Sequence, residues 1–147
     1  MNSVIKETKI RKLFLNIMTL VSFWLFTGIS SCSKDEKAML NGDWTVEKIR
    51  VHTDSTWRFP SNSYVLTLSE NKSYSIHLDI NTCGGSAKFE HNQQVVFQTG
   101  ACTKACCDSE FALKLMNILP TCTTYDNSDL RLQLKTNVGG QIFLIKK

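Results

Sequence analysis

Apolar and polar residues alternate with a period of two over most of the chain after Met39. The alternation is clearest in Tyr64–Ser69 and Tyr74–Ile80, which are separated by the polar turn Glu70–Lys72. In a strand, every second side chain lies on the same face, so these two segments predict a β-hairpin with one buried face. The same pattern predicts further strands at Trp44–Val51, Ser86–Glu90, Gln94–Gln98, Thr121–Tyr125, Leu130–Leu134 and Ile142–Ile145.

One segment, Asp108–Leu119, has a helical period instead. Its large apolar residues recur at intervals of four, seven and eight positions, which places them on one face of a helix; they are Phe111, Leu115, Ile118 and Leu119. Asp108 or Ser109 can cap the first turn, and Pro120 ends the helix. These patterns predict an α+β fold, in which a mostly antiparallel sheet or partial barrel carries one amphipathic helix over its open face or end.

The N-terminal segment follows neither pattern. Basic residues between Lys6 and Lys12 precede the apolar run Leu13–Gly28, which is shorter than the roughly 20 residues that a membrane-spanning helix needs. A basic start, a short apolar stretch and small residues after it are typical of a secretion signal.

The signal ends in Ile29-Ser30-Ser31-Cys32, which resembles the lipobox of bacterial lipoproteins. The resemblance implies that residues 1–31 are removed and that Cys32 carries the lipid, with palmitate among its acyl chains. Residues 32–38 then form a tether and residues 39–147 one domain, which is a usual size for a single core. The expected location is the outer membrane, and the expected membrane contact is made through this lipid.

The charged stretch Ser33–Lys37 leaves open which side of that membrane the domain faces. It resembles the export tag of surface lipoproteins of the Bacteroidetes, which would place the domain outside the cell. It is equally typical of a solvated tether kept extended by its charges, and then the face is undetermined.

Charge argues against a nucleic-acid partner. The formal net charge is +4, but most of the excess lies between Lys6 and Lys12, so the mature domain is close to neutral. Binding to phosphates needs a basic stripe, which is missing from this sequence. Common catalytic and phosphate-binding motifs are also missing, and His52, His77 and His91 are expected to be solvated. We therefore predict a protein that is not an enzyme and has no cofactor.

Several motifs after Met39 are similar to those of the META domain, the fold of HslJ-like lipoproteins. Leu40–Trp44 resembles the start of that domain, and Cys83-Gly84-Gly85 resembles its central motif, although Gly84 stands where asparagine is usual. The stretch from Thr103 to Cys106, the predicted helix and the last two strands resemble its C-terminal half. The resemblance implies an envelope protein without known catalytic residues, whose role is binding, structural or connected with envelope stress.

Five cysteines remain after Cys32, namely Cys83, Cys102, Cys106, Cys107 and Cys122. In an oxidising compartment they predict one or two disulfides, although an odd number cannot all pair. The META resemblance favours a bond between Cys83 and Cys106, which would leave Cys122 to pair with Cys102 or Cys107.

Two alternatives for these cysteines stay open. Cys102, Cys106 and Cys107 could bind Cu(I) or Zn²⁺, with Cys83, Cys122 or His91 as a fourth ligand. Alternatively, Cys106 or Cys107 could be a reactive thiol at the start of the helix.

The function predicted from the sequence is therefore a non-enzymatic role of a lipid-anchored domain. The alternatives are a thiol-based metal-binding lipoprotein and an inhibitor of secreted hydrolases or other partner-binding module. Trp44 is expected in the core. Trp57 and Phe59 interrupt the alternation and are expected in a loop, where packing against the core is favoured over an exposed contact surface.

Overall fold

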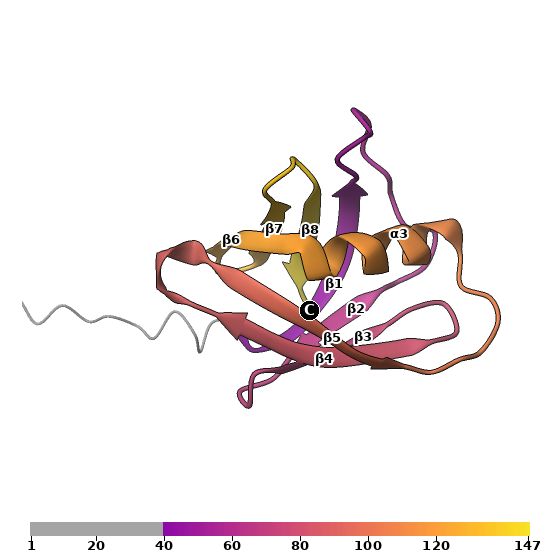
Figure 1. Ribbon diagram of the computed structural model, residues 1–147, viewed down its shortest axis with the longest axis horizontal. Coiled ribbons are helices and arrows are strands. Elements are labelled where there is room, and N and C mark those ends of the chain that lie inside the picture. The colour runs from indigo at the N-terminus through magenta and orange to yellow at the C-terminus, as the bar shows by residue number, and fades with distance from the viewer. Residues whose placement is uncertain (1–39) are drawn as a thin grey trace, which may run out of the picture. The chain divides into compact units, whose positions relative to one another are not determined.

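Eight antiparallel strands form one sheet in residues 40–147, the part of the chain that the computed structural model describes. The predicted signal, Cys32 and the tether lie outside the described residues. The strands are β1 (Gly42–Arg50), β2 (Val65–Leu68), β3 (Ser73–His77), β4 (Thr82–Phe89), β5 (Val95–Cys102), β6 (Cys122–Ser128), β7 (Arg131–Thr136) and β8 (Gln141–Lys146). Their spatial order is β5-β4-β3-β2-β1-β8-β7-β6 (Figure 1).

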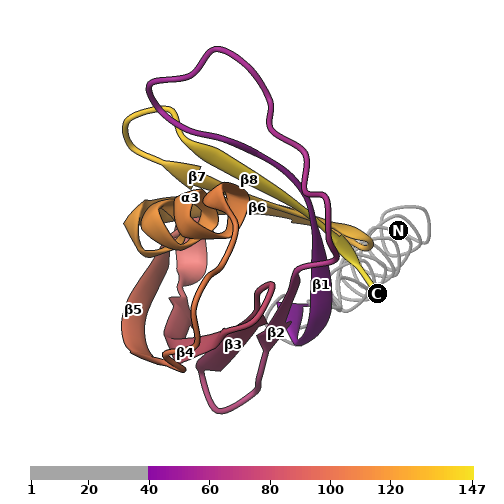
Figure 2. The same ribbon diagram turned by 90° about the vertical axis from the view of Figure 1, so that its right-hand side faces the viewer.

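The sheet is curled into a half-barrel, so that its two edge strands approach each other. Figure 2 shows the curl, with β5 and β6 on the side where α3 lies. An isolated bridge pairs Gln94, just before β5, with Thr124 of β6. The architecture is therefore the predicted α+β fold, a mostly antiparallel sheet with one short helix at its opening.

The alternation predicted the strands because one face of the sheet is buried throughout. In the predicted hairpin, Leu66 of β2 pairs with Ile76 of β3, and both side chains are buried. Trp44 of β1 is fully buried, and its indole N–H donates to the carbonyl oxygen of Leu40 at 2.7 Å. The expected core position of Trp44 is confirmed.

The helix α3 (Glu110–Ile118) confirms the segment of helical period. Ala112, Leu115 and Ile118 are buried, and Phe111 is half-buried with its ring stacked on Tyr64 at 5.2 Å between centroids. The 3-10 turn η2 (Leu119–Thr121) contains Pro120 and leads directly into β6. A second short turn, η1 (His91–Gln93), joins β4 to β5.

Strands β4 and β5 contain an irregularity that the alternation did not reveal. Gly85 pairs with Thr99, but Cys83 pairs with Cys102, so β5 has one extra residue between these two pairs. A β-bulge of this kind needs space between the backbones. Glycines supply it: a Cβ atom on Gly100 would lie 2.8 Å from the carbonyl oxygen of Gly84.

Candidate functional site

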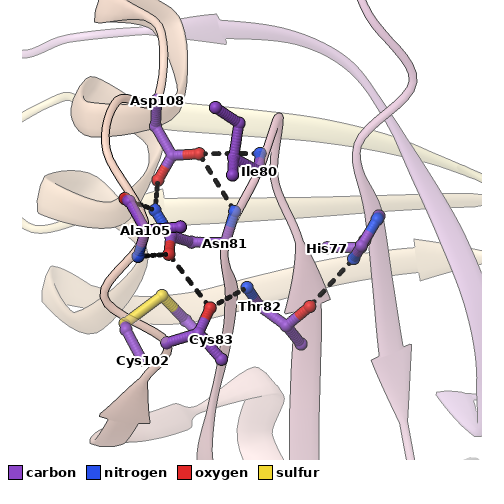
Figure 3. The surroundings of a disulfide bond; sticks show 9 residues. His77, Ile80, Asn81, Thr82, Cys83, Cys102, Ala105 and Asp108 are labelled. Atoms are coloured by element: carbon purple, nitrogen blue, oxygen red, sulfur yellow. Dashed lines mark hydrogen bonds between the residues drawn. A yellow bond between two sulfur atoms is a disulfide. The ribbon is translucent and has the colours of Figure 1, made fainter.

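The bulge determines which cysteines meet. With regular pairing continued from Gly85 and Thr99, Cys83 would face Ala101; the extra residue brings Cys102 opposite Cys83 instead. The structure accordingly has a disulfide between Cys83 and Cys102, whose Cα atoms are 4.0 Å apart (Figure 3). The predicted bond between Cys83 and Cys106 is therefore wrong.

The remaining cysteines also depart from the predicted pairing. Cys106 and Cys107 are bonded to each other in the exposed loop before α3. Cys122 is a free thiol buried at the start of β6, so it pairs with neither Cys102 nor Cys107. Burial raises the pKa of the Cys122 thiol to about 12, which keeps it protonated and unreactive.

The predicted metal ligand set is not assembled. Cys102 is bonded to Cys83 on the sheet, and Cys106 and Cys107 are bonded to each other, so none of the three has a free thiolate. Among residues 40–147, no three histidine, cysteine, aspartate or glutamate side chains are grouped so as to hold a metal ion. As long as both disulfides are intact, these three cysteines therefore offer no thiolate to Cu(I) or Zn²⁺.

A network centred on Asn81 holds the loop that carries Cys106 and Cys107 (Figure 3). Asn81 is buried, and its amide group donates to the carbonyl oxygen of Ala105 at 2.8 Å and accepts from the N–H of Ala105 at 2.8 Å. Asn81 also donates to the Asp108 carboxylate at 2.7 Å and accepts from the Thr103 hydroxyl at 3.0 Å. One buried amide thus fastens both ends of the loop to the turn between β3 and β4.

Asp108 completes this fastening instead of capping α3. Its carboxylate accepts from the backbone N–H groups of Ile80 at 3.0 Å and Asn81 at 3.2 Å. Burial by itself would raise the pKa of Asp108, but the hydrogen bonds from Asn81 and Ile80 outweigh it, and the pKa is lowered. The cap of α3 is Ser109, whose hydroxyl accepts from the N–H of Ala112.

Asp79 anchors the start of the helix on the other side. Its carboxylate accepts from the hydroxyl of Tyr64 at 2.6 Å, from the Asn62 amide at 2.6 Å and from the N–H of Ser109 at 2.9 Å. The hydrogen bond from Tyr64 is the main cause of a strongly lowered Asp79 pKa, while burial and the same bond raise the pKa of Tyr64.

The ionisation of these groups favours a positioning role. Asp79 and Asp108 stay ionised at neutral pH and their oxygens accept hydrogen bonds from the fold itself, so neither is tuned for proton transfer near pH 7. What the carboxylates do is hold a loop and a helix end against the β3–β4 turn. The network thus supports the surface on which Cys106 and Cys107 lie.

A second cluster lies on the outer face of the sheet, and we call it the Trp57 cluster. It consists of Lys48, Arg50, Trp57 and Phe143. The rings of Trp57 and Phe143 meet edge to face at 5.1 Å between centroids. The Lys48 ammonium lies 5.1 Å from the Trp57 ring and 4.9 Å from the Phe143 ring, and the Arg50 guanidinium lies 4.9 Å from the Trp57 ring.

A short bridge positions this cluster. Arg58 exchanges two backbone hydrogen bonds with Ile49, at 2.8 and 2.9 Å, so the loop after β1 folds back along the strand. Trp57 and Phe59 flank Arg58; Trp57 is half-buried against the outer face of the sheet, and Phe59 is 66% exposed. The loop position is confirmed, but the favoured packing of both aromatic rings into the core is wrong.

The histidines are solvated, as predicted. All three are exposed, and His77 on β3 makes a 2.9 Å hydrogen bond with the Thr82 hydroxyl. His91 lines a shallow, open depression at the β4–β5 turn, together with neighbouring residues such as Phe89, Asn92 and Gln94. In the same depression Lys88 and Glu90 form an ion pair of 2.5 Å, so this surface has little net charge.

The sequence analysis did not identify the residues that support the loop, and of the Trp57 cluster it identified only Trp57. Asn81 was not singled out, because a polar residue after a strand is usually solvated, and Tyr64 and Asp79 were treated only as positions within predicted strands. One signal was available: Asn81 follows directly after the predicted strand Tyr74–Ile80, where a buried amide can replace missing backbone partners. In the described part of the chain, no helix is long and apolar enough to span a membrane.

Neither a protein-family model nor a curated protein matches this sequence. Solved structures do share its fold. A DUF4847 family protein from Bacteroides vulgatus has a TM-score of 0.59 at 11% identity, covering 76% of this chain and 96% of that one. A protein from Burkholderia xenovorans determined by NMR has a TM-score of 0.58 at 18% identity, covering 76% and 86%. At these identities the likeness establishes the curled sheet and helix, and no activity.

Proposed function

We propose that this protein is an outer-membrane lipoprotein, anchored through Cys32, whose META-like domain works by binding. The lipobox-like Ile29–Cys32 and the charged residues after it support the anchor. The Trp57 cluster is the observation that carries the binding role, because it offers aromatic rings and two cations on a rigid sheet. Lys48 and Arg50 form no ion pair with any residue of the described range 40–147.

The anchor is tested by replacing the acylated cysteine. We expect Cys32→Ser in the full chain to abolish incorporation of a labelled palmitate analogue and to leave the signal uncleaved. Cys107→Ser is the matched control, because it removes a different cysteine and should still be acylated. Labelling of Cys32→Ser at the level of the natural chain would contradict the anchor. If the anchor holds, protease treatment of intact cells shows which face of the membrane carries the domain.

The charge and shape of the Trp57 cluster favour an acidic glycan as the ligand. A guanidinium and an ammonium bind carboxylates, and an aromatic ring packs against the apolar face of a sugar ring. Phe59, two residues after Trp57 in the chain, adds exposed apolar surface. A surface with only two uncompensated cations suits spaced carboxylates along a glycan better than the dense phosphates of a nucleic acid.

The position of the cluster along β1 also favours a ligand in solution over a lipid surface. The described chain enters β1 at Gly42, and the cluster lies at Lys48 and Arg50, at the other end of the strand. At about 3.3 Å per residue the ends of β1 are roughly 26 Å apart. Gly42, where the described chain enters β1, thus lies at the end of the strand remote from the cluster.

Binding is tested with polygalacturonate as an acidic glycan and dextran as a neutral one. We expect the full chain to be retarded in gels containing polygalacturonate, more weakly as salt is added, and not in dextran gels. The double variant Lys48→Glu with Arg50→Glu should bind at least about tenfold more weakly, the equivalent of roughly 1.4 kcal/mol.

The matched control reverses two charges elsewhere, in the variant Lys88→Glu with Lys104→Glu. Both side chains are exposed; Lys88 lies on β4, three strands from β1 in the sheet, and Lys104 lies in the loop after β5, so this variant should bind polygalacturonate like the natural chain. Equal weakening in both double variants would show that only net charge matters. Binding to anionic lipid vesicles without retardation by polygalacturonate would show that the cluster binds a membrane surface and would overturn the glycan as ligand.

A further inference from the structure

The bonded pair Cys106 and Cys107 differs from the other disulfide in its surroundings. Both residues are exposed, and they lie in the loop between β5 and α3. In the other disulfide Cys102 is exposed as well, but its partner Cys83 is 3% exposed and the bond joins the paired strands β4 and β5, so only the pair in the loop is exposed at both cysteines. A thiolate must reach a sulfur atom to break a disulfide, so exposure favours reaction at the pair in the loop.

The loop keeps its place without help from this bond. Ala105, just before the pair, exchanges two hydrogen bonds with Asn81, and Asp108, just after it, accepts from two backbone N–H groups. Ser109 is held in turn by Asp79. Because both flanks are fixed by groups that do not involve sulfur, opening the disulfide leaves the two thiols side by side on the surface.

A bond between neighbouring residues also does little for the fold. A disulfide stabilises chiefly by closing a loop of the unfolded chain, and the stabilisation falls as the loop shortens. The sequence separation is 1 for Cys106 and Cys107, against 19 for Cys83 and Cys102. The bond between Cys106 and Cys107 therefore adds little to the stability of the fold, whereas its exposure allows it to react with external thiols.

We propose that Cys106 and Cys107 form a reversible dithiol–disulfide site that exchanges electrons with external dithiols. A thiolate of the dithiol attacks one cysteine sulfur, forming a mixed disulfide and releasing the other cysteine as a thiolate. The second thiol of the reagent then attacks the mixed disulfide. The reagent leaves as a cyclic disulfide, and two electrons and two protons have passed to the protein.

The reduced pair has a second property that identifies it chemically. Two adjacent thiols chelate trivalent arsenic: phenylarsine oxide forms two As–S bonds and releases one water molecule. Cys122 cannot do this, because it is a single buried thiol. Binding of one arsenical per chain is therefore a measure of the open pair.

Reduction is tested on the folded full chain by labelling in two steps. The protein is treated with a limiting dithiol without denaturant, alkylated with a light reagent, then unfolded, fully reduced and alkylated with a heavy one. We expect the peptide containing Cys106 and Cys107 to carry the light label, and the peptides of Cys83, Cys102 and Cys122 the heavy one.

Each other outcome overturns the proposal. A light label on Cys106 and Cys107 before any dithiol is added would show that they are free thiols in the isolated protein. A heavy label after dithiol treatment would show that the bond is inaccessible. Simultaneous light labelling of Cys83 and Cys102 would show that the two disulfides open together.

Phenylarsine oxide provides an independent measurement with matched variants. The dithiol-treated natural chain should gain the mass of one arsenical per molecule, whereas Cys106→Ser and Cys107→Ser should each gain none. Both variants should keep the melting temperature of the natural chain, because the two side chains are exposed and the hydrogen bonds that fix the loop are retained. Binding that persists in either single variant would place the dithiol elsewhere.

Discussion

Replacing Cys83 and Cys102 together by alanine should lower the free energy of unfolding by about 3 kcal/mol. The bond closes a loop with a sequence separation of 19, and cross-links of this length restrict the unfolded chain by about that amount. Alanine keeps the buried position of Cys83 apolar, so no unsatisfied hydroxyl confuses the result. Urea unfolding of the full chain, followed by tryptophan fluorescence, measures the difference.

The matched control removes the other disulfide. Cys106→Ala with Cys107→Ala deletes the same number of sulfur atoms but closes no loop of consequence, so its free energy of unfolding should change by less than about 0.5 kcal/mol. A natural chain unfolded in strong reductant should lose as much stability as the Cys83 and Cys102 double variant. Equal losses in the two double variants would show that the sheet does not depend on the bond between β4 and β5.

The pairing of these cysteines illustrates what a sequence pattern cannot resolve. Period-two alternation identified the strands because burial of one sheet face repeats along each strand. A single extra residue in β5 changes the partner of Cys83 from Ala101 to Cys102, and it leaves almost no trace in the pattern of apolar residues. Gly100 and the pair Gly84-Gly85 were the only indication, because they permit a close approach of two backbones.

The helix was predictable to within a residue or two, but the use of the residues around it was not. Its apolar spacing and Pro120 located α3, and the choice between Asp108 and Ser109 as the cap stayed open. The structure uses Ser109 as the cap and directs Asp108 to the β3–β4 turn. Such a contact joins residues 27 and 28 positions apart, which no local propensity encodes.

The Trp57 cluster also depends on a contact between residues that are far apart in the sequence. Trp57 was expected to pack into the core, because a large aromatic side chain buries the most apolar area there. The bridge between Arg58 and Ile49 fixes the loop so that Trp57 lies on the outer face of the sheet instead. There its ring contacts Phe143 and the cations of β1. Sheet register decides this orientation, and register depends on strand partners that lie far apart in the sequence.

Replacing Leu115 by alanine should destabilise the protein by about 3 kcal/mol. Leu115 is fully buried on the face of α3 that closes the opening of the half-barrel (Figure 2), and truncating a buried leucine leaves a cavity that the neighbours fill only partly. Leu113→Ala on the same helix is the matched control. Leu113 is 57% exposed, so the free energy of unfolding of the Leu113→Ala variant should differ from that of the natural chain by less than about 0.5 kcal/mol.

Amide hydrogen exchange distinguishes two ways in which Leu115→Ala could act. If α3 belongs to the same cooperative core as the sheet, the slowest amides of β1 and β8 should exchange faster by the full loss of stability, together with those of α3. If only the amides of α3 exchange faster, the helix is a separately opening cover and the sheet is stable without it. We expect the first result, because Leu115 lies in one continuous cluster of buried residues with Trp44 and Leu144.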